Sequence, residues 1–231
     1  MKILIVSGFL GAGKTTFIKR LARNVDQRFA ILENEYGAAG IDGARLGQNR
    51  QGTQKNVWEM TEQCICCIGK KDFAASVLTI ANVVDPEYLI VEPTGVGSLA
   101  RIIENLRQIE YERIQLLSPV TIVDVYSYRR YMAEYPELYQ DQIRSADTII
   151  VSKTEACQAE EKQRIQKFLQ EINSQAKIIT DYASTMTRED YQSLLLGGRY
   201  EKEVQDTQSG EKMPETFSFE NIRMEAPETL W

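Results

Sequence analysis

The sequence contains no histidine, no excess of basic residues and no long hydrophobic run. Its 27 lysines and arginines are outnumbered by 33 aspartates and glutamates, and the net charge is −6. Because basic residues are what neutralise phosphate backbones, this balance argues against a nucleic-acid partner. No apolar run reaches the length of a membrane-spanning helix, so we expect no membrane partner either.

Cysteine is scarce, with four residues in the chain, yet three of the four are crowded into positions 64–67. The apolar N-terminal stretch is followed by a glycine-rich loop and not by the small-residue cleavage site of a signal peptide. We therefore expect a cytoplasmic protein, in a compartment where thiols stay reduced. There, a tight cysteine cluster indicates metal binding or redox chemistry before it indicates a disulfide.

Apolar residues make up 43% of the 231 residues, enough to bury one substantial core. Short β-branched runs alternate with longer amphipathic patterns along the chain. This alternation predicts an α/β protein with a mostly parallel sheet that is covered by helices on both faces. We expect strands at 3–7, 29–34, 56–60, 87–92, 120–125, 148–152 and 177–180, and helices at 15–25, 71–84, 98–109 and 158–172.

The stretch 8–16 reads GFLGAGKTT and matches the phosphate-loop pattern G-x-x-x-x-G-K-[ST]. It follows a predicted strand and opens a predicted helix, which is the context that the motif requires. Glycines allow backbone N–H groups to turn inward around phosphates, at a helix N-terminus that favours negative charge. Lys14 would neutralise the β- and γ-phosphates as a catalytic residue, and the Thr15 hydroxyl would bind Mg²⁺. The predicted nucleotide-binding residues here are Gly8, Gly11, Ala12, Gly13, Lys14, Thr15 and Thr16.

EYLIVEPTG at 87–95 provides the second half of the predicted site. A hydrophobic strand delivers Glu92 to its C-terminal end, where ligands bind in open α/β sheets. We expect Glu92 to be catalytic and to hold Mg²⁺ directly or through water. Gly95 would let the chain approach the γ-phosphate closely.

SKTE at 152–155 follows another buried strand and resembles the guanine-reading motif N-K-x-D. Ser152 stands for the asparagine, and Glu155 stands for the aspartate that accepts from two guanine N–H groups. The stem of Lys153 would pack along the base. These three residues are the predicted base-reading part of the nucleotide site.

In order along the chain, the sequence contains GFLGAGKTT, ENEYG, CICC, EPTG, VTIVDV, DQIRSAD and SKTE. From residue 1 to about 182 it thereby resembles the CobW-like GTPases, metallochaperones that are related to the GTPases inserting nickel into urease and hydrogenase. The resemblance implies a P-loop NTPase fold and slow GTP hydrolysis. It also implies delivery of a transition metal such as zinc or cobalt to a metal-requiring client protein or cofactor pathway.

Three features depart from the family pattern. Family members commonly carry a second domain, of which TFSFENIRM at 216–224 looks like the first strand. We accordingly expect a P-loop GTPase domain at 1–195, and a linker with a domain remnant at 196–231. Ala38 stands where the family usually has an acidic residue, so one possible metal ligand is removed. SKTE differs from N-K-x-D at two positions, which bears on guanine specificity.

The cysteine cluster favours a metal over a disulfide. Adjacent Cys66 and Cys67 would close a strained ring if oxidised, and Cys64 with Cys67 has redox-motif spacing outside the usual context of that motif. A divalent metal would deprotonate the thiols and draw the thiolates around one positive centre. The alternative is three small buried hydrophobic residues. With the resemblance, we favour a Zn²⁺ or Co²⁺ site at Cys64, Cys66 and Cys67.

Without histidine, a fourth ligand must be a carboxylate, water or a side chain of a partner. Glu33, at the end of a predicted strand, is the first candidate and resembles the acidic position of the family. Glu35 and Asp42 are weaker candidates. Cys157 stands alone near a predicted helix start, where we expect it to be structural.

We expect GTP and Mg²⁺ to order the loop 33–43 as a switch that changes metal affinity. The tyrosine-rich segment 124–142 indicates amphipathic helix faces that pack on the sheet or form a homodimer surface.

Two other functions remain open on the residues alone. One is a small-molecule kinase or synthetase using the phosphate loop, for which we find no convincing arginine-rich lid. The other is a nucleotide-dependent metal or redox sensor that is not a chaperone.

Overall fold

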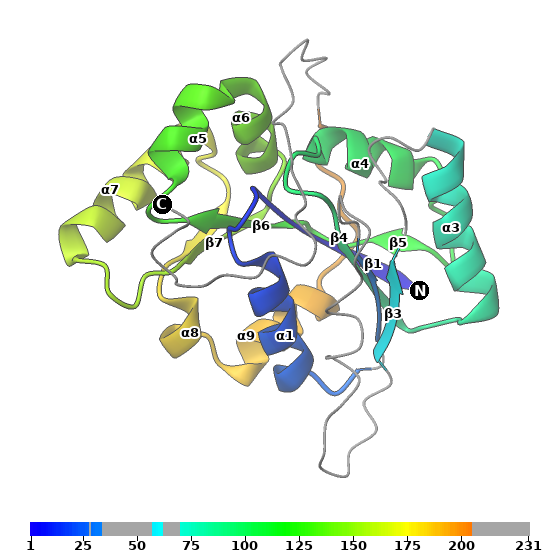
Figure 1. The fold of residues 1–231 in the computed structure, drawn as a ribbon. Helices are drawn as coiled ribbons and strands as arrows, with labels where there is room; N and C mark the ends of the chain where they lie inside the picture. The colour runs from blue at the N-terminus through cyan, green and yellow to red at the C-terminus, as the bar shows by residue number, and fades with distance from the viewer. Residues whose placement is uncertain (28, 34–56, 62–69, 205–231) are drawn as a thin grey trace, which may run out of the picture.

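The computed structural model describes residues 1–27, 29–33, 57–61 and 70–204. Within these ranges eight strands form one sheet in the order β3-β2-β4-β1-β6-β7-β8, with β5 paired to β1 (Figure 1). Every ladder between these strands is parallel, as the alternation of strands and helices predicted. The strands are β1 (Lys2–Gly8), β2 (Phe29–Glu33), β3 (Val57–Thr61), β4 (Tyr88–Glu92), β5 (Gln115–Leu116), β6 (Val120–Asp124), β7 (Thr148–Ser152) and β8 (Lys177–Ile179).

Helices cover both faces of the sheet (Figure 1). One face packs against α1, α8 and α9, and the other packs against α3, α4, α5, α6 and α7. The predicted P-loop NTPase fold, a mostly parallel sheet with helices on both faces, is confirmed by this arrangement. The helices are α1 (Lys14–Asn24), α3 (Lys70–Val83), α4 (Leu99–Arg107), α5 (Tyr128–Glu134), α6 (Pro136–Arg144), α7 (Ala159–Ile172), α8 (Tyr182–Thr185) and α9 (Arg188–Leu196).

The central strand β1 is buried on both sides, which explains its unbroken apolar sequence. Leu4 and Val6 pack with the α1 side of the core, whereas Ile3 and Ile5 pack with the α3 and α4 side. Successive side chains of a strand point to opposite faces, so one apolar run serves two cores. β1 also stands where the strand order reverses, between β4 and β6. Ligands of open α/β sheets bind outside the strand ends at such a point.

The tyrosine-rich segment forms α5 and α6, which pack on the sheet as one of the two readings expected. The homodimer surface stays a prediction.

The short strand β5 and the helices α8 and α9 were not predicted. α9 is capped by Thr187, whose hydroxyl accepts from the backbone N–H of Asp190, while the Asp190 carboxylate accepts from Thr187 in return. Such a capping box is a local sequence signal for the start of a helix, and it does not depend on hydrophobic periodicity.

Chain beyond α9 continues to pack on the domain. The backbone of Arg199 forms an isolated antiparallel β-bridge with that of Leu117. Tyr200 is buried, and its hydroxyl donates to the Ser145 carbonyl at 2.9 Å. The larger part of the segment predicted as linker and remnant, 205–231, lies outside the described residues. In the part of the chain that the structure describes, no helix combines the length and apolar character needed to cross a membrane.

Candidate functional site

The phosphate loop joins β1 to α1 through glycines in backbone conformations that other residues rarely adopt. Gly8 has a φ of 145°, and a Cβ added to it would lie 2.4 Å from the carbonyl oxygen of Ile122. Gly13 precedes α1 with a φ of 98°. Lys14 is buried, and its Nζ donates to the Gly8 carbonyl at 3.1 Å. The loop therefore closes on its own lysine at the N-terminus of a helix, where anions are favoured.

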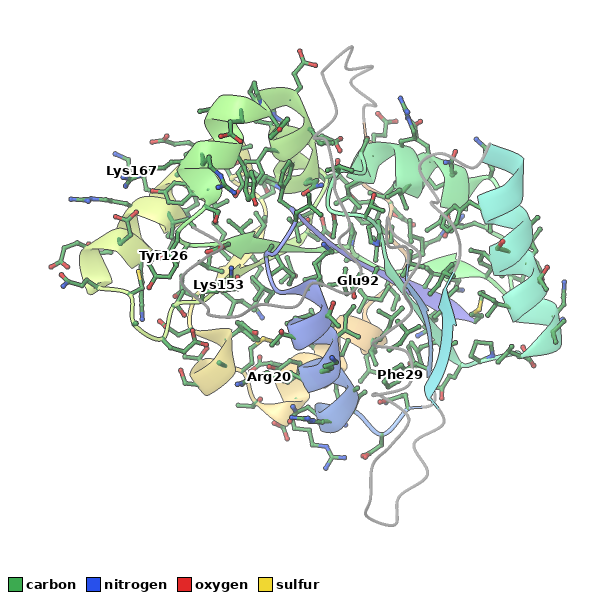
Figure 2. All side chains as sticks on the ribbon, viewed as in Figure 1. Arg20, Phe29, Glu92, Tyr126, Lys153 and Lys167 are labelled. Carbon is green, nitrogen blue, oxygen red and sulfur yellow. The ribbon has the colours of Figure 1, made fainter. Side chains whose placement is uncertain are left out.

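Thr15, in the first turn of α1, meets Glu92, the last residue of β4. The Thr15 hydroxyl donates to the two carboxylate oxygens of Glu92 at 3.0 and 3.2 Å. Both groups offer oxygen atoms, the ligands that Mg²⁺ prefers. Thr15 directly follows Lys14 of the phosphate loop, and Glu92 is labelled in Figure 2. The pair predicted to hold Mg²⁺ is thus brought together by the fold.

The loop after β4 rests directly on the phosphate loop. A Cβ added to Gly95 would lie 2.4 Å from the Leu10 nitrogen and 2.8 Å from the Phe9 carbonyl carbon. No side chain larger than hydrogen fits in that space, so glycine is required by the close approach of two backbones. The two loops of the predicted phosphate site therefore touch.

The predicted base-reading residues follow β7. The Ser152 hydroxyl is buried and donates to the Ala12 carbonyl at 2.6 Å, so this residue braces the phosphate loop. Lys153 has a left-handed φ of 59° and pairs with Asp124, with 2.7 Å between Nζ and Oδ2. Glu155 is exposed. Burial raises the pKa of the Tyr182 hydroxyl in α8, Arg20 opposes the shift, and the charges of Tyr191 and then Glu155 make smaller contributions in the same direction as burial.

Asp124 is a residue of the site that the sequence did not single out. It ends β6, and it is only 6% exposed. Besides Lys153, its carboxylate accepts from the Tyr126 backbone at 2.9 Å and from the Ser127 hydroxyl at 3.0 Å. Its signal was the same as that of Glu92, an acid at the C-terminal end of a buried parallel strand.

The helices α5 and α6 cover the outer side of the phosphate loop. The rings of Phe9 and Tyr131 have centroids 4.2 Å apart, and the Tyr131 hydroxyl donates to the Leu10 carbonyl at 3.1 Å. Tyr139 packs edge-on to Phe9, and its burial, followed by the nearby Asp124 charge, raises its pKa. The tyrosines thus hold the phosphate loop from outside.

Most of the predicted transition-metal ligands belong to segments outside the described residues. Cys64, Cys66 and Cys67 lie outside the described residues, as do Glu35, Ala38 and Asp42. Glu33 is the last residue of β2, and its Cα is paired in register with Glu92 of β4 on one side and with Thr61 of β3 on the other. Among the residues with described positions, no group of three or more cysteines or carboxylates could hold a metal ion.

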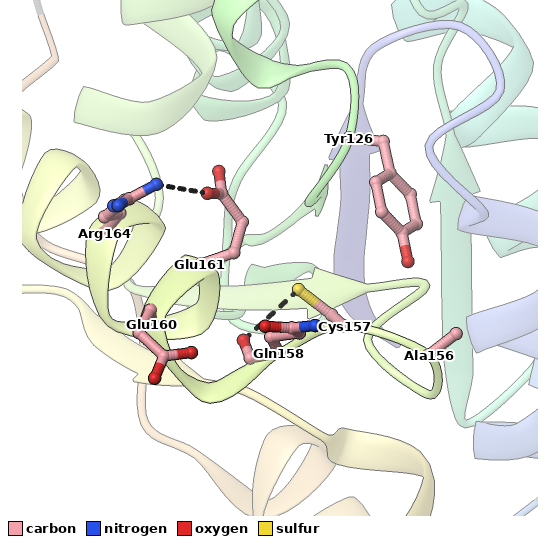
Figure 3. Close-up of a pocket in the computed structure, with 7 residues that line it drawn as sticks. All are labelled: Tyr126, Ala156, Cys157, Gln158, Glu160, Glu161 and Arg164. Carbon is pink, nitrogen blue, oxygen red and sulfur yellow. Dashed lines mark hydrogen bonds and ion pairs between the residues drawn. The ribbon is translucent and has the colours of Figure 1, made fainter.

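Cys157 lines a surface pocket of about 440 Å³ near the start of α7 (Figure 3). It is partly buried, packs against the core on the α7 side, and its Sγ lies 3.6 Å from the Gln158 carbonyl oxygen. These contacts agree with the structural role expected for it. The other lining residues are Tyr126, Ala156, Gln158, Glu160, Glu161 and Arg164.

Sequence comparisons place the nucleotide site in a known family context. The family model described as "CobW/HypB/UreG, nucleotide-binding domain" matches residues 2–180. The zinc chaperone YeiR of Escherichia coli K12 is 30% identical over 178 residues, which are 76% of this chain and 53% of YeiR. The zinc chaperone CobW of Pseudomonas aeruginosa is 27% identical over 209 residues, 78% of this chain and 56% of that protein. The chain spans about half the length of these curated relatives.

Solved structures show the same fold. Zn(II)-bound YjiA GTPase of Escherichia coli superposes with a TM-score of 0.59 at 20% identity, covering 87% of this chain and 66% of YjiA. The hydrogenase maturation factor HypB of Archaeoglobus fulgidus gives a TM-score of 0.57 at 17% identity, covering 85% of this chain and 89% of HypB. At these identities the likeness concerns the arrangement of the sheet and helices.

Proposed function

The chain belongs to the CobW/HypB/UreG family of nucleotide-binding domains, and on that premise we propose that it binds GTP with Mg²⁺, hydrolyses it, and couples hydrolysis to binding and delivery of a transition metal. The observation that carries the proposal is the hydrogen bond from Thr15, the residue after Lys14 of the phosphate loop, to Glu92 at the end of β4. A phosphate loop, its lysine and an acid on the adjacent strand are the parts that P-loop hydrolases use.

The residues at this site fit a magnesium nucleotide. The Thr15 hydroxyl and the Glu92 carboxylate lie within 3.2 Å of each other and both supply oxygen ligands. When bound, Mg²⁺ would neutralise charge on the β- and γ-phosphates. Lys14, which now donates to the Gly8 carbonyl, would turn its donors to the phosphate oxygens. Hydrolysis would then depend on positioning and on charge stabilisation.

Guanine selection is proposed for the loop after β7. Lys153 of that loop is held by Asp124, and Glu155 is exposed two residues further along. The Ser152 hydroxyl of the same loop donates to the Ala12 carbonyl of the phosphate loop. This hydrogen bond connects the proposed base-binding loop to the phosphate loop. Glu155 would accept from the paired N–H groups of guanine, which adenine does not offer.

The transition metal is the proposed cargo, and zinc or cobalt is the proposed class. Support comes from the curated relatives, which are named zinc chaperones. Cys64 follows Thr61 by three residues, and Thr61 ends β3 beside Glu33 of β2. Thiolates at Cys64, Cys66 and Cys67 with the Glu33 carboxylate would make a ligand set that zinc and cobalt accept. Delivery implies a client protein that requires the metal.

Coupling between the two ligands is proposed to pass through Glu33. Its backbone lies next to Glu92, the candidate Mg²⁺ ligand, because β2 and β4 are paired in register. A nucleotide that moves the end of β4 would therefore act on the end of β2. Linkage requires that metal and GTP change each other's affinity by the same factor, and a tenfold factor needs only about 1.4 kcal/mol.

A cobalt titration with and without a non-hydrolysable GTP analogue tests the proposal. We expect one cobalt per chain, thiolate–cobalt absorption, and affinity at least about threefold higher with the analogue than with GDP. Single-turnover assays should show GTP hydrolysis that responds to cobalt or zinc. The Cys64/Cys66/Cys67 triple serine variant should lose the absorption, whereas Cys157→Ser should keep it. Hydrolysis that does not occur in the parent, or equal metal affinity in both nucleotide states, would contradict the gated carrier.

A further inference from the structure

Two adjacent polar residues of α6, Asp141 and Gln142, are buried beneath the loop that follows β4. They are 5% and 1% exposed. Neither residue belongs to the phosphate loop, the base-reading loop or the predicted metal site. Burying an amide and a carboxylate is costly unless each is hydrogen-bonded, so their partners indicate why they are there.

Gln142 forms hydrogen bonds with a short turn in that loop, at Gly95 and at Gly97. Its Nε2 donates to the Gly95 carbonyl at 3.2 Å and to the Gly97 carbonyl at 3.0 Å. The turn between them is closed by the Gly97 N–H, which donates to the Thr94 carbonyl at 3.0 Å. Because two carbonyl oxygens face the amide, only its NH₂ end can point toward the turn.

Asp141 holds the other end of the same segment. Its Oδ2 accepts from the backbone N–H of Leu99 at 2.7 Å and of Ala100 at 3.4 Å, the first two residues of α4. These N–H groups have no partner within their own helix, and the positive end of α4 favours the carboxylate. α6 therefore fixes the segment from Gly95 to Ala100 at two separate points.

The opposite side of the turn rests on the phosphate loop. A Cβ on Gly95 would come within 2.4 Å of the Leu10 nitrogen, so the peptide at Gly95 has no room to shift inward. Gln142 prevents the same peptide from shifting outward. The position of the Gly95 backbone relative to the phosphate loop is thus set by contacts from both sides.

We propose that Gln142 is a positioning residue for the γ-phosphate, acting through the Gly95 backbone, and that Asp141 supports it by anchoring α4. The inference rests on the proposed GTPase function. In the proposed site the γ-phosphate of a triphosphate would lie toward Gly95, and a diphosphate would lack that group. Gln142 should therefore govern the discrimination between GTP and GDP and the rate of hydrolysis, with little effect on nucleotide binding in general.

Gln142→Met tests this directly, because methionine keeps the volume of the side chain and removes its N–H donors. We expect GDP affinity within about threefold of the parent, and a fall of at least about tenfold in affinity for a non-hydrolysable GTP analogue or in the single-turnover rate. Gln142→Asn keeps the amide but shortens the side chain by one methylene. It should show the same bias and serves if the methionine variant does not fold.

Asn173→Leu is the matched control. Asn173 is likewise a buried amide, and its Nδ2 donates to the carbonyls of Ile143 and Ala146 at 2.8 Å each, at the C-terminal end of α6 and not at the loop after β4. It should lower stability while the ratio of analogue affinity to GDP affinity stays that of the parent.

Two outcomes separate the inference from its premise. If the parent hydrolyses GTP and Gln142→Met changes both affinities equally, or behaves as Asn173→Leu does, the positioning role is wrong and the GTPase proposal stands. If the parent binds neither GTP nor its analogue, the proposed function fails and the positioning role fails with it.

Discussion

The Thr15 hydroxyl and the Glu92 carboxylate lie 3.0 Å apart although 77 residues separate them in the chain. Parallel pairing of β1 with β4, in a register that sets Lys2 opposite Tyr88 and Ile5 opposite Val91, brings the two strand ends to the same edge. The contact joins the first helix after the phosphate loop to the second strand of the site. It is the relationship from which the magnesium proposal follows.

Glu92→Gln should weaken the dependence of GTP affinity on Mg²⁺ by at least about tenfold, since an amide is a poor substitute for a carboxylate ligand. The amide oxygen can still accept from Thr15, so the thermal unfolding midpoint should change little. GTP titrations at several Mg²⁺ concentrations measure the effect. Glu87→Gln makes the same charge change at the exposed opposite end of β4 and should leave the Mg²⁺ dependence intact. Equal Mg²⁺ dependence in both variants would remove Glu92 from the site.

Glu155→Ala should weaken GTP binding by about tenfold or more and ATP binding hardly at all, because guanine alone presents the paired N–H donors. Competition of GTP, ITP and ATP for the site measures this preference. Glu160→Ala removes an exposed acid from the first turn of α7 and provides the control. A parent protein that binds GTP and ATP equally would show that SKTE does not select guanine.

Asp124→Asn should reduce the preference for GTP over ATP by up to about tenfold, because Lys153 loses the charge that holds its side chain. The asparagine oxygen can still accept from the Tyr126 N–H, so the turn after β6 should survive. Asp147→Asn, whose carboxylate accepts from the Ser118 hydroxyl at 2.5 Å on the other end of β7, is the matched control. Nucleotide selectivity that is the same in the two variants would count against a role for Asp124 in base reading.

Gly8→Ala and Gly11→Ala should differ strongly in stability. Gly11 has a φ of 68° and open space around an added Cβ, so alanine there should cost about 1–2 kcal/mol in the free energy of unfolding. At Gly8 the added Cβ would meet the Ile122 carbonyl oxygen at 2.4 Å, in backbone that cannot yield easily. A further penalty of about 1–3 kcal/mol is expected for this overlap. Urea unfolding of both variants provides the measurement, and equal midpoints would contradict the close approach of Gly8 to the Ile122 carbonyl of β6.

The pair Lys162–Asp181 should make stability depend on pH. The hydrogen bond from Lys162, helped by one from Thr154, lowers the pKa of the Asp181 carboxyl below its ordinary value. A lowered folded-state pKa stabilises the fold above the unfolded pKa of about 4, and this contribution is lost as pH falls through the folded value. Asp181→Asn should therefore destabilise at pH 7 and approach the parent in strong acid.

Asparagine is the suitable replacement because Asp181 has a left-handed φ of 57°, which asparagine also tolerates. Lys162→Gln should show the same pH-dependent loss, and the double variant should add little to either single one, because one interaction is removed in each case. Unfolding midpoints at pH 7 and at about pH 3 measure these differences. Losses in Asp181→Asn that are equal at both pH values would show that the ion pair is not their source.

The local elements of the nucleotide site could be predicted from the sequence. Seven of the eight predicted strands lie within the described residues, and each of these is present within two residues of its expected ends, because β-branched apolar runs of strand length leave few alternatives. The eighth, at 216–224, lies outside the described residues. The phosphate loop could be placed because Gly8, Gly13 and Lys14 meet a strict local requirement for turn geometry and charge. The short helix α8 and the two-residue strand β5 could not, since their stability comes from packing and not from their own pattern.

By itself, then, the sequence determined what is local: which segments are strands, where the phosphate loop turns, and which acids end a buried strand. Tertiary structure decided which of these ends meet. Thr15 faces Glu92 and Lys153 faces Asp124 because β4 and β6 flank β1. Gln142 faces Gly95 because α6 lies over the loop that follows β4. A hydrogen bond across 29 to 77 residues depends on strand order, which no local spacing of residues encodes.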